Sequence, residues 1–166
     1  NSTYEIAYSG RDTAVLSSKR GWNLVGMPLM SGDTLADVAE ASGNALRRGS
    51  FWGWFTDTML PIPLEYPFAC EQGYWVFSAT DWTSPALEGI RGDGVVILQP
   101  GWNLVSPTST CSSPDDPAIA WPGWSWNAGA RVYRPQRAAD PLVAGQAYWL
   151  HVEGDLPIIV LLGDGT

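Results

Sequence analysis

The chain has 166 residues, 16% of them charged, and a formal net charge of −8 at pH 7. Nucleic acids and anionic membrane surfaces repel such a charge, so we expect neither as a partner. No apolar run approaches the roughly 18 residues of a membrane-spanning helix, and we expect no membrane insertion. The 18 glycines, 13 prolines and 10 tryptophans favour short strands and tight turns over long helices.

Two sequence signatures each occur twice. Gly-Trp-Asn-Leu-Val occupies Gly21–Val25 and again Gly101–Val105, an offset of 80. Gln-Gly-Tyr-Trp-Val at Gln72–Val76 is matched by Gln-Ala-Tyr-Trp-Leu at Gln146–Leu150, an offset of 74. Self-similarity over such distances indicates one structural unit used twice. We predict a first repeat at 14–89 and a second repeat at 95–163, the second being six residues shorter between its signatures.

The size of the repeats bears on domain organisation. Each has about 75 residues, a length at which burial of apolar surface is marginal. We therefore predict a single domain, 1–166, in which the two repeats share one core. Residues 1–13 have no counterpart in the second repeat and form an N-terminal extension. Alternation in Tyr4–Tyr8 predicts an edge strand there, and Asn1–Thr3 fits a glycosylation sequon.

The first predicted element of each repeat is a β-hairpin. It joins Ala14–Ser17 to Trp22–Val25 in the first repeat, and Val95–Leu98 to Trp102–Val105 in the second. Alternation along the second strand places its Trp and Leu on one face and its Asn and Val on the other. We expect the asparagine of each signature to hydrogen-bond to backbone groups at the strand start.

One stretch has helical periodicity, Asp33–Arg48. Asp33 is a suitable N-cap, and Gly49 is suited to ending the helix. The apolar stripe consists of Leu35, Val38 and Ala39. The second repeat has a Pro- and Ser-rich segment at this place instead.

The remaining predicted elements are strands: Ser50–Thr56, Gly73–Ser78 and Ala86–Gly89, then Trp124–Val132, Ala147–Val152 and Ile158–Leu162. This gives about five short strands per repeat, spaced as in sandwiches and barrels. The predicted fold is all-β, an internally duplicated pseudo-two-fold β-sandwich or closed barrel of about ten short strands with one short helix.

The residue types that carry catalysis are sparse. His151 is the one histidine, and no nucleophile-elbow motif precedes it. Two cysteines and one histidine lack the spacing of zinc ligands, and we interpret Asp115-Asp116 as a solvated turn. We therefore expect no enzyme, no metal and no cofactor. Cys70 and Cys111 either form a disulfide between the repeats or remain two separate buried thiols.

The tryptophans are the most informative residues. Six pair between the repeats by sequence, and we predict that they are core: Trp22 with Trp102, Trp52 with Trp126, and Trp75 with Trp149. Trp54, Trp82, Trp121 and Trp124 have no such partner. Leu156 replaces Trp82 in the second repeat, which predicts ordinary apolar packing for Trp82.

A segment of the second repeat is the candidate binding site. Ala120–Trp126 carries three indoles around a Pro-Gly pair, more than one turn can bury. An exposed aromatic platform is costly unless something stacks on it, and sugar rings stack on indoles. Nearby side chains are expected to donate to sugar hydroxyls, carboxylates or sulfates. The predicted ligand-binding residues are Trp54, Trp121, Trp124, Arg131, Tyr133 and Arg134. Alternatively, this segment plugs the end of a barrel.

Together, the two signatures resemble a repeat found in secreted and cell-surface multidomain proteins of bacteria and archaea. The resemblance covers residues 14–163. The second repeat departs from it at Ala147, where the first has Gly73, and at Ser106-Pro107, where the first has Gly26-Met27. The resemblance implies a secreted or cell-surface location beside neighbouring domains of a parent protein. We expect a non-catalytic carbohydrate-binding module that binds a polysaccharide or glycan. The alternative is a structural module that mediates domain or protein contacts.

Overall fold

The structure, a computed structural model, describes residues 11–163. The predicted strand Tyr4–Tyr8 and the sequon Asn1–Thr3 lie outside these residues. Fifteen short strands occur in the described part of the chain: β1 (Asp12–Ala14), β2 (Ser17–Ser18), β3 (Gly21–Gly26), β4 (Leu29–Met30), β5 (Phe51–Phe55), β6 (Thr58–Pro61), β7 (Gly73–Ser78), β8 (Trp82–Thr83), β9 (Leu87–Arg91), β10 (Val95–Leu98), β11 (Gly101–Val105), β12 (Ile119–Asn127), β13 (Val132–Gln136), β14 (Tyr148–Val152) and β15 (Ile158–Leu161). All their pairings are antiparallel, so the all-β prediction is confirmed.

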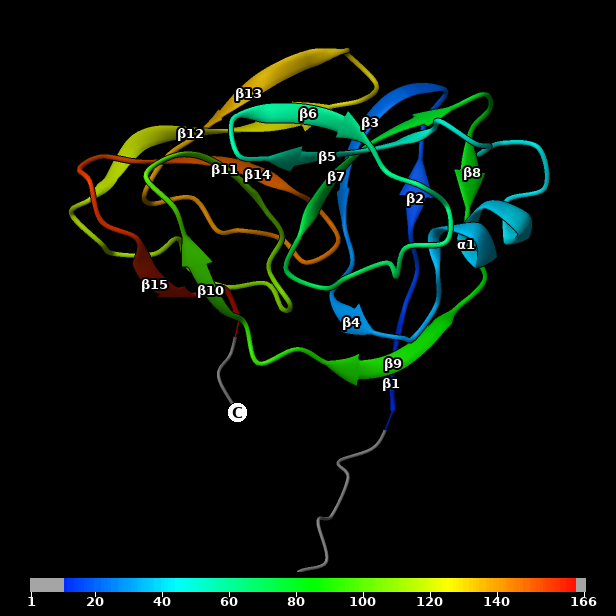
Figure 1. The fold of residues 1–166 in the computed structure, drawn as a ribbon, viewed down its shortest axis with the longest axis horizontal. Coiled ribbons are helices and arrows are strands. Elements are labelled where there is room, and N and C mark those ends of the chain that lie inside the picture. Colours follow the sequence, from blue (N-terminus) through cyan, green and yellow to red (C-terminus); the bar gives the residue numbers. More distant parts are fainter. Residues whose placement is uncertain (1–10, 164–166) are drawn as a thin grey trace, which may run out of the picture.

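The internal duplication appears as two four-stranded sheets. The first repeat orders its strands β3-β7-β5-β6, and the second orders them β11-β14-β12-β13. The register also repeats, because Trp22 lies opposite Phe77 as Trp102 lies opposite His151. The two repeats lie side by side, blue to green and green to red (Figure 1). The chain therefore uses one strand order twice.

The predicted hairpins at the repeat starts are wrong. β1 pairs with β9, β2 with β8 and β10 with β15, and none of them pairs with the strand that follows the turn. Short flanking strands of two to four residues make up most of the excess over the predicted ten. These sheets remain separate, and no closed barrel forms.

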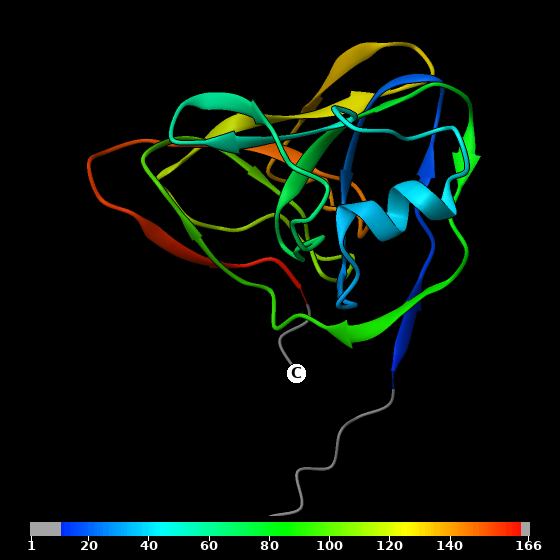
Figure 2. The same cartoon turned by 45° about the vertical axis from the view of Figure 1, so that its right-hand side comes forward.

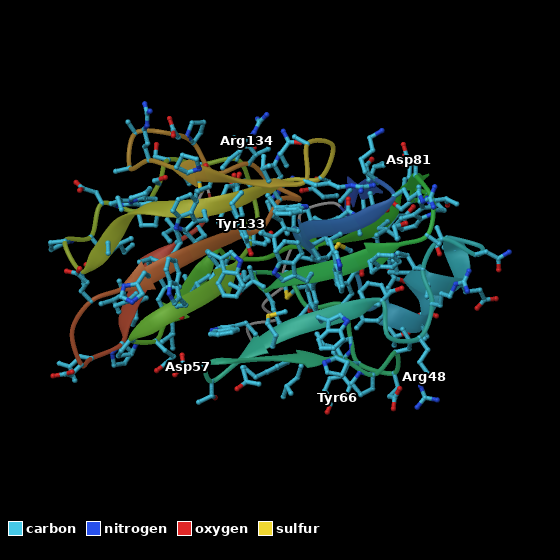
Figure 3. The ribbon with its side chains drawn as sticks, turned by 90° about the horizontal axis from the view of Figure 1, so that it is seen from above. Arg48, Asp57, Tyr66, Asp81, Tyr133 and Arg134 are labelled. Atoms are coloured by element: carbon cyan, nitrogen blue, oxygen red, sulfur yellow. The ribbon has the colours of Figure 1, made fainter. Side chains whose placement is uncertain are left out.

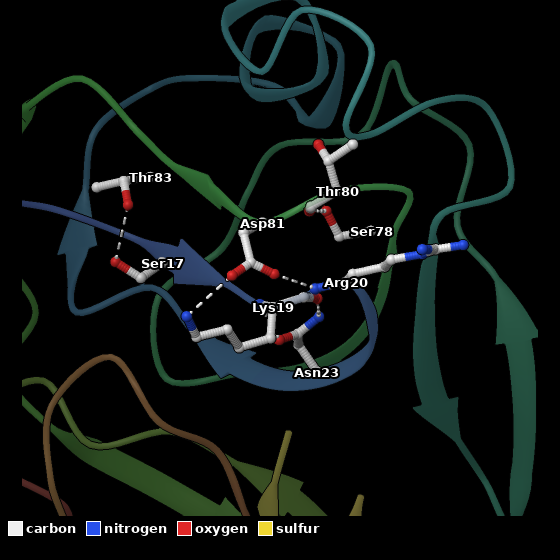
Figure 4. A network of polar contacts seen from close by, with 8 residues as sticks. All are labelled: Ser17, Lys19, Arg20, Asn23, Ser78, Thr80, Asp81 and Thr83. Carbon is white, nitrogen blue, oxygen red and sulfur yellow. Dashed lines mark hydrogen bonds and ion pairs between the residues drawn. The ribbon is translucent and has the colours of Figure 1, made fainter. Parts of the chain in front are cut away.

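The asparagine of each signature closes the turn that separates these strands. The Asn23 amide donates to the carbonyls of Lys19 (2.7 Å) and Gly21 (2.9 Å) and accepts from the Lys19 N–H (2.8 Å). Asn103 makes the same three bonds at 2.8–3.0 Å. Asp81 adds an ion pair to Lys19 from β8's side of the turn (Figure 4). The structural role predicted for the asparagines is confirmed.

The helix is shorter than predicted. α1 spans Leu35–Ala41, and its N-cap is Thr34 rather than Asp33, in a capping box with Asp37. Its predicted apolar stripe is buried, as expected. Figure 2 shows α1 lying across the first repeat, below β5 and β6. Turns occupy most of the stretch up to Gly49, where a continuous helix was expected.

The repeats have separate cores, which corrects the prediction of one shared core. Leu35, Phe51 and Tyr74 belong to the first core, and Leu142 and Tyr148 to the second. A third, small cluster joins the repeats and consists of Leu24, Leu104 and Ala147. Both cores lie on the same side of the two sheets, which leaves the opposite side of the sheets for other contacts.

Candidate functional site

Eight of the ten tryptophans lie on the side of the sheets away from the two cores. Strand alternation turns Tyr74 and Val76 toward the first core and Trp75 the other way. We call these eight indoles and Tyr133 the aromatic face: Trp22, Trp52, Trp54, Trp75, Trp102, Trp124, Trp126, Trp149 and Tyr133. Figure 3 views the sheets from above, with Tyr133 near the middle.

The aromatic face holds two cavities. Cavity one has a volume of about 370 Å³, and its walls are Trp54, Trp102, Trp124, Trp149 and Tyr133. Cavity two has about 390 Å³, and its walls are Trp22, Trp52, Trp75, Trp126, Met59 and Tyr133. Both fall in the range typical of small-molecule sites. Four tryptophans wall each cavity, and Tyr133 belongs to both.

The two cavities are equivalent under the repeat symmetry. Trp124 pairs with Trp149 across β12 and β14, as Trp52 pairs with Trp75 across β5 and β7. Trp124 is therefore the counterpart of Trp52, which corrects the sequence pairing of Trp52 with Trp126. The reason is a longer hairpin turn. Residues 128–131 connect β12 to β13, whereas two residues, 56–57, connect β5 to β6.

Each hairpin of the middle strands reaches onto the other repeat. The Trp54 indole N–H donates to the carbonyl of Trp102 (2.8 Å), and the Trp126 N–H donates to the carbonyl of Trp22 (2.8 Å). The same two indoles contact the neighbouring rings edge to face. The ring centroids of Trp54 and Trp149, and those of Trp126 and Trp75, are 5.1 Å apart. Each cavity is thus built from both repeats.

Tyr133 occupies the boundary between the cavities. Its ring lies edge to face with Trp126 and Trp75, at centroid distances of 5.1 and 6.0 Å. Burial raises the pKa of its hydroxyl, and the nearby Trp149 indole N–H lowers it by a smaller amount. That N–H is buried and does not reach hydrogen-bond geometry with any described group. Tyr133 is the one ionisable residue that lines either cavity.

The predicted core role of the paired tryptophans holds in part, because Trp75, Trp126 and Trp149 pack, partly buried, against the third cluster. No tryptophan of the chain is fully buried, and Trp22 and Trp102 remain 41% and 39% exposed. The strands carry apolar side chains on both faces, as in Tyr74-Trp75-Val76, so alternation does not tell which face is the core. The smaller side chains face the cores, and the indoles form the opposite face. Which face of each sheet is buried depends on the segments that pack against it.

The structure brings together three of the six predicted binding residues. Trp54, Trp124 and Tyr133 line cavity one. Trp121 packs instead against the second core. Arg131 lies in the β12–β13 turn beside Gly21. Arg134 is exposed on β13 but pairs with Ser125, so alternation points its side chain away from the aromatic face.

Other chemistry-bearing residues do not line the two cavities. His151 is partly buried, with its ring 4.9 Å from that of Trp102. Trp82 packs against the first core, as predicted. Cys70 and Cys111 are thiols that form no disulfide with each other, so the disulfide alternative is not realised. Residues 11–163 contain no cluster of three potential metal-ligating side chains.

No protein-family model matches the chain, and neither curated proteins nor solved structures give a match. No helix in residues 11–163 is long and apolar enough to cross a membrane.

Proposed function

We propose that this chain is a non-catalytic carbohydrate-binding module of a larger secreted or cell-surface protein, with the aromatic face as its binding site. The observation that carries the proposal is the pair of equivalent indole-walled cavities on one open face. Sugar rings present apolar C–H faces that fit indole walls. A chain of sugars would place one residue in each cavity.

The composition of the cavities favours binding over catalysis. Glycoside hydrolysis uses two carboxyl groups on either side of the scissile bond. No carboxyl group lines either cavity within the described residues. Contact with apolar ring faces therefore supplies most of the affinity in this proposal, and polar groups at the rim orient the chain.

Affinity electrophoresis tests this proposal. The protein should be retarded in gels that contain the polysaccharide it binds, from a panel of neutral and acidic polymers. Trp102→Ala should lose most of the retardation, because this exposed indole is a wall of cavity one, and its backbone carbonyl still accepts from Trp54. Trp121→Phe is the matched control, since Trp121 lies off the face, and its retardation should not change. Absence of retardation on every polymer would refute the proposal.

A second candidate function is a structural module that contacts a neighbouring domain. The observation in its favour is an aliphatic ladder on the small sheet of the second repeat. Val95 lies opposite Leu161 and Ile97 opposite Ile159, and all four are exposed, Ile159 by 70%. The corresponding sheet of the first repeat pairs polar Ser17 with Thr83. The fold therefore does not require an apolar residue at the position of Ile97, where the first repeat has Ser17.

The two functions are separable by experiment. Ile97→Lys with Ile159→Lys should leave sugar binding intact and should abolish self-association or domain contact in sedimentation velocity runs. Acrylamide quenching of tryptophan fluorescence adds a second measurement. A clearly accessible subset of indoles is expected for the sugar-binding role, whereas uniform protection favours the structural one.

A further inference from the structure

We infer that the ligand of the aromatic face is a uronic-acid polysaccharide, whose carboxylates are bound by arginines beside cavity two. This inference rests on the proposed carbohydrate-binding function and names the class of sugar. It follows from the placement of the unpaired arginines, and from a difference in charge between the equivalent ends of the two repeats.

Most arginines of the described chain lack an acidic partner. Three basic residues form ion pairs: Arg11 with Glu88, Lys19 with Asp81 and Arg91 with Asp12. The basic residues without an ion pair in residues 11–163 are Arg20, Arg47, Arg48, Arg131, Arg134 and Arg137. The net charge of the protein is −8, which disfavours an anionic ligand over most of the surface. These arginines are the positions at which a negatively charged ligand group finds an uncompensated positive charge.

Two of these arginines adjoin the aromatic face. Arg47 and Arg48 line a third cavity of about 500 Å³, together with Trp22 and Trp52. The same two indoles wall cavity two. A sugar stacked in cavity two therefore has its neighbouring unit beside Arg47 and Arg48, two exposed residues that line this third cavity. Figure 3 shows Arg48 near α1, at the end of the sheet opposite Asp57.

Equivalent positions in the two repeats carry opposite charges. The Arg131 Nε lies 3.9 Å from the place where a Cβ on Gly21 would be, next to Trp22. At the matching place in the second repeat, the Asp57 Oδ1 lies 3.8 Å from the corresponding point on Gly101. The fold accepts either sign here. The positive charge of Arg131 beside Trp22 is therefore not needed for folding, and it is open to selection for binding.

The chemistry of a uronate fits this arrangement. Its carboxylate is attached directly to the pyranose ring, so it lies at the ring edge while the ring face stacks on indole. A guanidinium binds a planar carboxylate with two parallel hydrogen bonds. Cavity one, which has Asp57 near its end, takes an adjacent unit through its ring face.

The test compares one polymer in two charge states. Isothermal titration measures binding of the full chain to polygalacturonate and to its methyl ester, which has the same backbone without the charge. Arg47→Glu with Arg48→Glu should weaken binding to polygalacturonate at least about tenfold and leave binding to the ester unchanged. Arg11→Glu with Arg134→Glu makes the same change in net charge away from the aromatic face and should have little effect.

The outcomes separate this inference from the proposed function. Equal affinity for both polymers, or equal losses in the two double variants, overturns the assignment of a uronate but leaves sugar binding standing. Binding to dextran sulfate without binding to polygalacturonate overturns it in favour of sulfate esters. If Trp102→Ala abolishes binding to every polymer and the arginine variants do not change affinity, the uronate assignment is overturned. Ring stacking alone then accounts for binding.

Discussion

Glu71 has a left-handed backbone conformation at a position where its repeat counterpart is glycine. It has φ of 66°, and the equivalent position in the second repeat is Gly145, with φ of 83°. A non-glycine residue in this region is uncommon. The Glu71 carboxylate accepts from the N–H of Gly94 (3.1 Å), and its carbonyl accepts from Ser106 (2.9 Å). The side chain thus holds the connection between the repeats.

Replacement of Glu71 by Gln is expected to stabilise the protein at neutral pH. Burial raises the pKa of this carboxyl, and Asp93 raises it further, against a lowering by the Gly94 N–H. A carboxyl whose pKa is higher in the folded state costs stability once it ionises, and the cost vanishes below its unfolded value, about 4.3. The gain of Glu71→Gln in urea unfolding should therefore be present at about pH 7 and absent at about pH 4. A gain that does not shrink on acidification would contradict this account.

The β5–β6 and β12–β13 hairpins are the elements that join the repeats. Each places one indole over the edge strand of the other repeat's four-stranded sheet, β11 or β3. The outward-facing carbonyl of that strand has no neighbouring strand to bond, and the indole N–H donates to it. The sequence prediction placed Trp126 in the core and Trp124 in the exposed binding site. The structure places both on one face, and the register shift of β12 lies before Trp124. The two indoles differ both in packing and in hydrogen bonding, because Trp126 packs against the third cluster and donates to Trp22, and Trp124 does neither.

Phenylalanine substitutions test this difference. Trp126→Phe and Trp54→Phe each remove an indole N–H and leave a carbonyl unpaired, which should cost about 1–2 kcal/mol of unfolding free energy. Trp124→Phe removes no described hydrogen bond and should cost under about 1 kcal/mol. Thermal unfolding of the three variants gives the comparison. Equal losses in all three would show that the hydrogen bonds contribute nothing.

At the scale of the whole molecule, the pseudo-two-fold axis explains where the repeats differ. A Cβ on Gly26 would overlap the side chain of Ser106, its counterpart. A Cβ on Gly73 would lie 2.7 Å from the Cβ of its own counterpart, Ala147. Side chains of equivalent residues meet each other at the axis. There is room for one, so one repeat has glycine where the other has Ser or Ala.

A swap across the axis tests this explanation. Gly26→Ala should destabilise the protein by about 1–3 kcal/mol through overpacking. Ser106→Gly alone should be nearly neutral, because the Ser106 hydroxyl is buried without a partner. The double variant Gly26→Ser, Ser106→Gly should recover most of the loss in urea unfolding. An additive result, with the double variant no better than Gly26→Ala, would mean that the two positions do not share one space.

The fold class and three residues of the aromatic face could be read from the chain. The signatures identified the repeats because the same local contacts, such as the asparagine turns, need the same residues twice. Trp54 and Trp124 were found as indoles without a sequence counterpart, and Tyr133 as a neighbouring hydrogen-bond donor. Trp22 and Trp102 were missed because repetition was attributed to the core. The aromatic face repeats as well, so repetition alone cannot separate it from the core.

The sequence by itself determined the repeated strand pattern, the apolar stripe of the helix and the turns closed by Asn23 and Asn103, because these depend on contacts within a few residues. Tertiary structure decided the rest. Which strands pair, which sheet face is buried, and how the indoles of one repeat reach the carbonyls of the other all depend on groups distant in the chain. A two-residue difference in one hairpin turn shifted the equivalence of the tryptophans, and only the pairing of β12 with β14 shows it.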